Sequence, residues 1–209
     1  MRPREDDIAR IAEQAWLMVG GNPTKDSRFN RPEIELLVRQ AVSKLFQTRV
    51  FENYKIDQSW DVPGEFMVNF ANVPVLYDQD RLQSFINSPS QFVNLPKSKG
   101  VYSIAPMQNP RGAFIPVPAN SYVFEGTRES KYLQGNIGYI IEGRRIYFTI
   151  DIFNERNINE LLVRLVTGDA PSELLMIPAD MEADIIQMVL GQLKESGKTD
   201  QEEDNVDQS

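Results

Sequence analysis

The spacing of hydrophobic residues changes along this chain of 209 residues, and the change constrains the fold more than any single motif. Towards both ends, apolar residues recur every three or four positions, which is the spacing of one face of an α-helix. Between about residues 56 and 170, apolar and polar residues alternate, and aromatic and β-branched residues are frequent. This separation of helical and strand-like segments predicts an α+β fold with a central antiparallel β region.

The first helix is predicted from a continuous apolar face near the N-terminus. This face consists of Ile8, Ile11, Ala12, Ala15, Trp16, Met18 and Val19. Asp6 and Asp7 suit the positive end of the helix dipole, and Gly20-Gly21 followed by Pro23 is expected to end the helix.

A second helix is predicted after Asn30, which is a favourable N-cap residue. Pro32 lies in its first turn, Glu33 stands three residues after the cap as in a capping box, and we expect the helix to run to about Tyr54. Its apolar face consists of Ile34, Leu37, Val38, Ala41, Leu45 and Phe46. A hairpin of two amphipathic helices cannot bury both apolar faces by itself, so something else must cover it.

Seven strands are predicted in the central region. They cover residues 66–70, 73–77, 101–105, 113–117, 122–124, 137–141 and 145–148. Glu142-Gly143 is expected to form a tight turn, so that residues 139–141 pair with residues 146–148 in a hairpin.

One further segment, residues 161–166, is ambiguous between helix and strand. Asn157 and Glu160 could cap a helix, but the short length of the segment before Gly168 favours a strand.

A final helix is predicted after Ile177-Pro178, with acidic residues in its N-terminal half. Its apolar face consists of Met181, Ile185, Met188, Val189 and Leu193. The remaining residues, 196–209, have no apolar residue except Val206, so we expect this tail to be disordered unless a partner orders it.

These elements predict a single α+β domain over residues 1–195, followed by a separate acidic tail over residues 196–209. Within the domain, we expect a helical hairpin in residues 1–55, a mainly β region in residues 56–170 and the C-terminal helix in residues 171–195.

Composition narrows the possible chemistry, because the chain contains no histidine and no cysteine. These two residues supply most general bases, thiolate nucleophiles and soft metal ligands in enzymes. We therefore predict that the protein is not an enzyme, that it has no catalytic, cofactor-binding or metal-binding residues and that it needs no cofactor.

Charge and hydropathy argue against two further classes of protein, namely nucleic-acid-binding proteins and membrane or secreted proteins. The formal net charge is -8, from 22 basic and 30 acidic residues, which argues against a dedicated nucleic-acid-binding protein. The acidic tail contributes half of this charge. No apolar run is long enough for a membrane helix, and the charged N-terminus lacks the apolar core of a secretory signal, so we expect the chain to stay where it is made.

Asp78-Gln79-Asp80 is the strongest candidate for a metal site, because its two carboxylates have the spacing of a clamp for a divalent ion. The alternative interpretation is a turn capped by aspartate, which is the commoner use of such a pair.

Other candidate motifs have simpler structural interpretations. Gly20-Gly21 follows a helix and is not a phosphate loop. Several serines and lysines lack the partners of a hydroxyl nucleophile, namely Ser27, Ser43, Ser59 and the loop Lys97-Ser98-Lys99. Three aromatic residues are interpreted as core or interface anchors, namely Trp60, Tyr102 and Phe114.

A basic patch is also possible near the predicted hairpin turn. It would consist of Arg144 and Arg145 with Arg111, Arg128 and Lys131 in neighbouring loops. If these side chains gather, they could bind nucleic acid or an acidic protein surface, and the acidic tail of a neighbouring copy is the simplest partner. The alternative is solubilising charge at loop tips.

The order of these segments resembles the connector or ring proteins of tailed bacteriophages, in particular those of crAss-like phages. The resemblance spans nearly the whole chain to Leu193 and rests on short motifs. These motifs are Asp26-Ser27-Arg28-Phe29, Val73-Pro74-Val75, Leu95-Pro96-Lys97-Ser98-Lys99-Gly100-Val101, Ile104-Ala105-Pro106, Arg144-Arg145-Ile146-Tyr147-Phe148, Leu174-Leu175-Met176-Ile177-Pro178 and Ile185-Ile186.

The resemblance implies a non-enzymatic virion structural protein that forms a homo-oligomeric head-to-tail connector at the portal vertex. Its expected partners are copies of itself in a ring, commonly of about twelve, together with the portal and neighbouring ring or tail proteins. Neighbours would cover the helices, and DNA would pass through an acidic lumen without specific binding. Two alternatives stay open: a monomeric or dimeric binding module such as an assembly chaperone, and a metal-dependent enzyme using Asp78 and Asp80.

Overall fold

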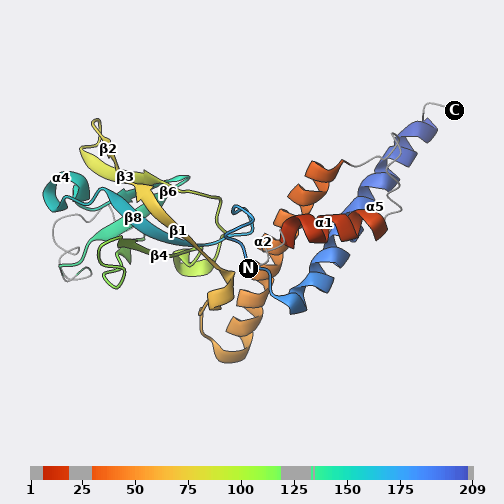
Figure 1. The fold of residues 1–209 in the computed structure, drawn as a ribbon, viewed down its shortest axis with the longest axis horizontal. Coiled ribbons are helices and arrows are strands. Elements are labelled where there is room, and N and C mark those ends of the chain that lie inside the picture. The colour runs from red at the N-terminus through yellow and green to blue at the C-terminus, as the bar shows by residue number, and fades with distance from the viewer. Residues whose placement is uncertain (1–6, 19–29, 119–132, 134, 207–209) are drawn as a thin grey trace, which may run out of the picture. The chain divides into compact units, whose positions relative to one another are not determined.

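The computed structural model describes residues 7–18, 30–118, 133 and 135–206, with side chains as far as Lys194. In these residues, no helix is long and apolar enough to cross a membrane. The protein has an α+β fold, as predicted, and divides into two compact units (Figure 1). The helical unit combines Met1–Gln58 with Gly168–Ser209, and the β unit is Ser59–Thr167.

This division differs from the single domain expected over residues 1–195. The two ends of the chain build one core together, whereas the middle of the chain builds its own core. The spacing of hydrophobic residues predicts which face of each helix is apolar, but it does not predict which other element packs against that face.

In the described residues of the helical unit, three main helices pack on one another. They are α1 (Asp7–Met18), α2 (Arg31–Asp57) and α5 (Glu182–Val206), the last entered through the short 3-10 helix η4 (Ala179–Met181). Asn30 is the N-cap of α2, and Glu33 completes the capping box that the sequence predicts. The glycine pair and Pro23, which were expected to end α1, lie outside the described residues.

Helix α5 covers the apolar faces of the helical hairpin. Its inward residues Met181, Ile185, Val189 and Leu193 are all buried. The hairpin residues buried with them are Ile8, Ile11, Ala12, Ala15, Ile34, Val38, Ala41, Val42, Leu45, Phe46 and Val50. The expectation that neighbouring copies cover these helices is therefore wrong, because the chain returns to cover them itself.

Helix α5 also continues further than the predicted end at residue 195. It runs to Val206, through most of the segment expected to be disordered. The expectation considered only the lack of apolar residues. A helix that is already nucleated by packing can be extended without the cost of a new nucleus, so polar residues can continue it.

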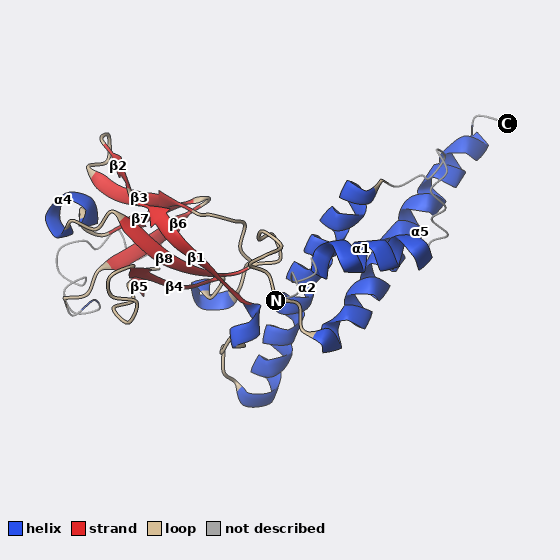
Figure 2. Cartoon of the chain, viewed as in Figure 1, coloured by secondary structure: helices blue, strands red, loops and turns tan. Residues whose placement is uncertain are grey.

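The described residues of the β unit form two sheets (Figure 2). The three-stranded antiparallel sheet has the order β1 (Met67–Pro74), β8 (Glu160–Val166), β4 (Val101–Pro106). The five-stranded sheet has the order β2 (Leu76–Asp78), β3 (Gln83–Asn87), β7 (Arg145–Phe148), β6 (Gly138–Glu142), β5 (Ile115–Pro116), with only β5 and β6 parallel. The β unit also contains the short helices η1 (Gly64–Phe66), η2 (Pro96–Ser98) and α4 (Ile152–Arg156) among its described residues.

Most predicted strands that lie in the described residues are confirmed, although the predicted strand 113–117 is shortened to β5 (Ile115–Pro116). The ambiguous segment is strand β8, and the predicted hairpin is β6 and β7, joined by a turn in which Gly143 has a φ of 61°. The predicted strand 73–77 is divided between β1 and β2. Strand β3 was not predicted, and the predicted strand 122–124 lies outside the described residues.

The two faces of the five-stranded sheet have different environments. One face carries the fully buried side chains of Ile86, Ile146 and Phe148, and the Tyr139 hydroxyl on this face donates to the Val101 carbonyl of the other sheet at 3.5 Å. This inner face therefore forms the core between the sheets. Since side chains alternate along a strand, Phe85 and Tyr147 lie together on the opposite, outer face.

Candidate functional site

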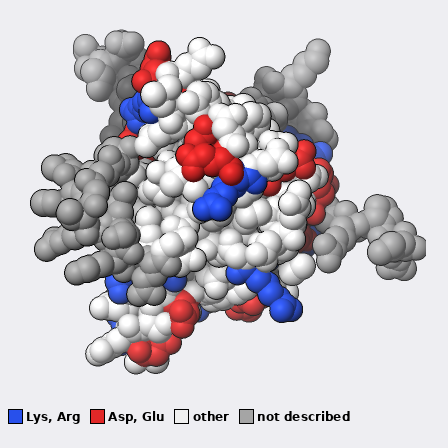
Figure 3. Space-filling model, turned by 90° about the vertical axis from the view of Figure 1, so that its left-hand side faces the viewer, with Lys and Arg blue, Asp and Glu red and all other residues white. Residues whose placement is uncertain are grey.

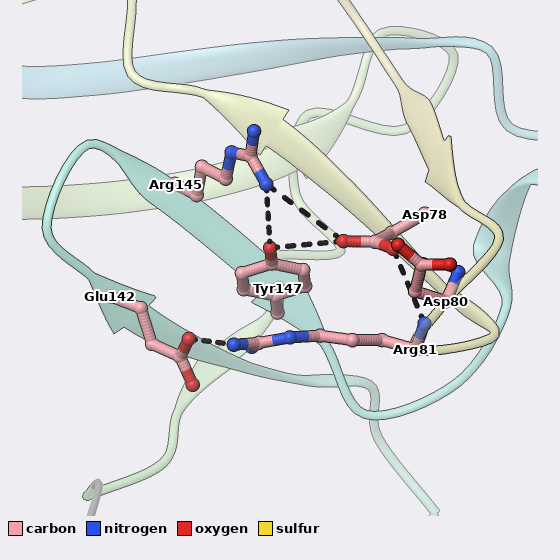
Figure 4. A network of polar contacts seen from close by, with 6 residues as sticks. All are labelled: Asp78, Asp80, Arg81, Glu142, Arg145 and Tyr147. Carbon is pink, nitrogen blue, oxygen red and sulfur yellow. Dashed lines mark hydrogen bonds and ion pairs between the residues drawn. The ribbon is translucent and has the colours of Figure 1, made fainter.

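A network of charged and aromatic side chains covers the outer face of the five-stranded sheet. Figure 4 shows its members, which come from the β2–β3 turn and from strands β2, β6 and β7. These are Asp78, Asp80, Arg81, Glu142, Arg145 and Tyr147.

Asp78 organises the turn between β2 and β3. Its Oδ1 atom accepts hydrogen bonds from the backbone N–H groups of Asp80 at 3.1 Å and Arg81 at 3.2 Å. This is the aspartate-capped turn that was the alternative to a metal clamp. The two carboxylates of the Asp-Gln-Asp motif therefore have different roles, because only Asp78 accepts these turn bonds.

The other carboxylate oxygen of Asp78 faces strand β7. The Tyr147 hydroxyl donates to Asp78 Oδ2 at 3.2 Å, Arg145 Nη1 donates to the Tyr147 hydroxyl at 3.2 Å, and Arg145 Nη1 lies 3.9 Å from the same carboxylate oxygen. Partial desolvation by itself raises the pKa of Asp78, but the hydrogen bonds and the nearby guanidinium outweigh it and lower the pKa overall.

Arg81 crosses the outer face from the turn to strand β6. Its guanidinium carbon lies 4.5 Å from the centre of the Tyr147 ring, and its Nη1 donates to Glu142 Oε2 at 2.6 Å. The hydrogen bond to Glu142 raises the pKa of Arg81. Arg81 thus fastens the β2–β3 turn to a strand two positions away in the sheet.

The two arginines also shield a pair of aromatic rings. The Arg145 guanidinium carbon lies 5.1 Å from the centre of the Phe85 ring, and the rings of Phe85 and Tyr147 are 5.5 Å apart. As a result, Tyr147 is only 4% exposed and Phe85 only 9%, although both lie on the outer face. Cation–π contacts and ion pairs here replace a further apolar layer.

The side-chain network is better suited to stabilising the outer face of the five-stranded sheet than to binding a metal ion. Both oxygens of Asp78 already accept hydrogen bonds within the network. Within the described part of the chain, no group of three or more acidic residues could hold a metal ion. Figure 3 shows the β unit from the side on which Figure 1 labels α4 and β2. Acidic and basic side chains lie next to one another there in small groups, on a mostly uncharged surface.

The β2–β3 turn, which the network stabilises, contains the exposed residue Leu82. This residue has a φ of 53°, in the left-handed region, and its side chain is 70% exposed. Of the described non-glycine residues with positive φ, Leu82 alone has a hydrophobic side chain. Branched apolar residues rarely adopt this conformation, so the turn combines backbone strain with an exposed apolar group.

The predicted basic patch can be described only in part. Arg145 is engaged in the network, Arg144 and Arg111 are exposed, and Arg128 and Lys131 lie outside the described residues. Of the members that can be described, the network therefore pairs only Arg145 with an acidic side chain.

The serine and lysine candidates have structural surroundings. Ser43 accepts a hydrogen bond from the Gly168 N–H at 3.1 Å, and Ser59 accepts one from the Asp61 N–H at 3.2 Å. Ser27 and the Gly20-Gly21 pair lie outside the described residues.

The aromatic and lysine candidates divide between core and surface. Phe114 is a core residue, since its ring packs edge-on at 5.4 Å against that of Phe148. Trp60 is half-buried, whereas Tyr102 is exposed below the Lys99 ammonium, which lies 5.8 Å from the ring centre. Lys97 and Ser98 are exposed in η2.

Sequence reasoning missed Arg81, Leu82, Glu142 and Tyr147 as members of one site. Pairing of β6 with β7 was predicted, and it places Glu142 opposite Arg145. The site was missed because strand β3 was not predicted. Pairing of β3 with β7, through Phe85 and Tyr147, brings the β2–β3 turn to the outer face of the sheet.

Comparison with known proteins adds no assignment, because no protein-family model and no curated protein sequence matches this chain.

Proposed function

We propose that this chain is a non-enzymatic virion structural protein. In this proposal it forms a homo-oligomeric ring or adaptor between portal and tail at the neck of a tailed bacteriophage, where it is part of the conduit for DNA ejection. The ring would contain about twelve copies, contact the portal and neighbouring ring or tail proteins, and assemble in the host cytoplasm. The copy number and these partners rest on the sequence resemblance.

The observation that carries the proposal is the composition of the candidate site. Its charged groups are paired with one another: Arg81 with Glu142, and Arg145 with Tyr147 and Asp78. Such pairing stiffens a hairpin turn and displays an apolar side chain at its end. A rigid apolar projection is suited to contact between proteins, since buried apolar groups supply most binding energy at interfaces.

Charge distribution agrees with a DNA conduit. Residues 59–167 contain 10 basic and 10 acidic residues, so the whole net charge of -8 belongs to the helical unit. A negatively charged surface repels phosphate groups, which would let DNA pass without adhering.

The second candidate is a small binding module or assembly chaperone that acts as a monomer or dimer. One observation favours it: α5 covers the helical hairpin, so the helical unit buries its core without help from neighbours.

Native mass spectrometry and negative-stain electron microscopy of the full chain separate the two functions. The connector predicts closed rings that increase with protein concentration, and in infected cells it predicts the chain at the neck of purified particles. A stable monomer or dimer at all concentrations, together with absence from purified particles, would favour the binding module instead.

A further inference from the structure

The chain passes between the helical unit and the β unit at two places, after Gln58 and after Thr167. Each unit buries its own set of apolar side chains. The backbone at these two crossings therefore limits how the units can move, whatever else holds them. Hydrogen bonds on either side of each crossing determine how much freedom the backbone has.

The crossing at Thr167 has no spare length. Thr167 directly follows strand β8, is fully buried, and its hydroxyl donates to the Gln91 carbonyl in the β unit. The next residue, Gly168, donates its N–H to Ser43 Oγ on α2 at 3.1 Å. Two adjacent residues are thus fastened to different units, and a single peptide bond joins them.

Helix α2 holds the chain closely on the helical side of this crossing. A Cβ atom on Gly168 would lie 2.6 Å from the Arg39 carbonyl oxygen and 2.9 Å from the Ser43 nitrogen, so only glycine fits against the helix here. The Arg39 guanidinium also donates to the Ala170 carbonyl and, at 3.4 Å, to Ser172 Oγ. The segment after the crossing is therefore fixed to α2 at Arg39 and Ser43.

The other crossing lies at the end of the same helix. Gln58 is the C-cap of α2, with a φ of 56°, and its N–H donates to the Tyr54 carbonyl at 2.9 Å. The backbone turns directly beyond it, where the Ser59 hydroxyl accepts the Asp61 N–H at 3.2 Å. The positions of Ser43 and Gln58 on α2 are separated by about 22 Å at the rise of an α-helix. Both crossings therefore leave the helical unit from one helix, at two well-separated points.

We propose that a hinge joins the two units, with its axis along the C-terminal half of α2. One pivot is the link between Thr167 and Gly168, and the other is the turn after Gln58. Two fixed points allow rotation about the line between them and oppose sliding or separation. Hinges are commonly a few residues at the ends of helices and strands, and these pivots follow β8 and α2. The hinge lies within one chain, so it does not depend on the proposed ring.

A hinge with this axis makes a geometric prediction that a flexible tether does not. A point on the axis keeps its distance from every point of the β unit during rotation, whereas a point away from the axis does not. Thr48 is exposed on α2 between the two crossings. Glu13 is exposed on α1, which packs beside α2, and packed helices have axes about 8 to 10 Å apart. Glu155, exposed on α4, is a reporter position in the β unit.

Double electron–electron resonance between pairs of nitroxide labels measures these distances. The chain has no cysteine, so the labels can be placed on chosen cysteine substitutions alone. Thr48→Cys with Glu155→Cys should give a distance distribution as narrow as the control pair Glu13→Cys with Thr48→Cys, which lies within the helical unit. Glu13→Cys with Glu155→Cys should give a distribution about twice as wide or wider. Dilution with unlabelled chain ensures that each distance lies within one copy.

Added length at the Thr167 crossing tests this pivot directly. Insertion of two glycines between Thr167 and Gly168 leaves the anchors on both sides unchanged and adds up to about 7 Å of chain. The distribution between Thr48 and Glu155 should then become as wide as that between Glu13 and Glu155. The matched control is the same insertion after Gly143, in the exposed turn between β6 and β7, which should change neither distribution.

Three results would overturn the inference. Narrow distributions for both pairs that span the units would show a rigid joint. Wide distributions for both pairs before any insertion would show a tether without an axis. An unchanged distribution between Thr48 and Glu155 after the insertion at Thr167 would show that this crossing is not a pivot. All three results would leave the connector function standing, because that function is tested by oligomerisation and these distances are not.

Discussion

The two units of this protein bury apolar surface by different means. The helical unit joins distant parts of the sequence, so that α5 covers α1 and α2 with aliphatic side chains. The β unit is continuous in sequence, and on the outer face of its larger sheet the aromatic pair is covered by arginines that are themselves held by acids. The first cover consists mainly of buried apolar side chains, with ion pairs only at its margin, whereas the second is polar and remains at the surface.

This difference predicts where substitutions act. Apolar cover is part of the core, so its loss should cost folding free energy. Polar cover at the surface is exposed to water and salt, so its loss should change local order more than global stability.

The largest effect is expected from Ile185→Ala, which removes a fully buried side chain where α5 covers the hairpin. The lost burial and the remaining cavity should lower the free energy of unfolding by about 2 to 5 kcal/mol. Hydrogen exchange should show the loss in α1, α2 and α5 and much less in the β unit. The control is Ile186→Ala, a half-buried neighbour. Equal exchange in both units would show that they do not unfold separately.

A smaller effect is expected from crowding inside the β unit. A Cβ atom on Gly100 would lie 2.0 Å from the Val93 carbonyl oxygen, so Gly100→Ala must displace backbone and should cost about 1 to 3 kcal/mol in chemical denaturation. Gly64→Ala, where no atom lies within 4 Å, is the matched control.

The helical unit should respond to the same substitution with the opposite sign. Nothing lies within 4 Å of a Cβ on Gly191 in α5, so Gly191→Ala should stabilise by about 0.5 to 1 kcal/mol through helix propensity. A loss of stability there would contradict the helix at this position.

A weaker contribution is expected from the ion pair that joins α1 to α5. Arg10 donates to both carboxylate oxygens of Glu182, at 2.9 and 2.5 Å, and this lowers the pKa of Glu182. The stabilisation is therefore complete above the unfolded-state pKa, near 4.5, and is lost as the pH falls through the lower folded-state pKa. Glu182→Gln should cost about 0.5 to 1 kcal/mol at pH 7.

The pH profile provides the control for this pair. Stability of the unsubstituted chain should decline more steeply below about pH 4.5 than that of Glu182→Gln, because the variant lacks the titrating group. Parallel profiles would mean that the ion pair adds nothing to stability.

The smallest effect is expected in the polar network of the β unit. Asp78→Ala should speed hydrogen exchange of the Asp80 and Arg81 amides several-fold, because it removes their acceptor, whereas Asp80→Ala should not. Calorimetry with Mg²⁺ tests the metal alternative on the same variants. Heat of binding that both substitutions abolish would restore the metal clamp and weaken the structural role assigned to Asp78.

Prediction from sequence succeeded where the signal is local. The capping box at Asn30 and Glu33 needs only neighbouring residues, and so does the turn at Gly143. The aspartate-capped turn at Asp78 was likewise among the interpretations available from three consecutive residues. The candidate site as a whole was not predictable, because it depends on β3, which the alternation of hydrophobic residues did not reveal.

The sequence by itself determined the α+β class, the apolar face of each helix and most strand positions, because these follow from periodicity and local capping. Only the tertiary structure decided that α5 covers the hairpin in place of a neighbouring copy. It also decided that Arg81 reaches across the sheet to Glu142, and that Leu82 is held at an exposed turn. These features depend on contacts between residues far apart in the chain, and an apolar or charged side chain does not specify its distant partner.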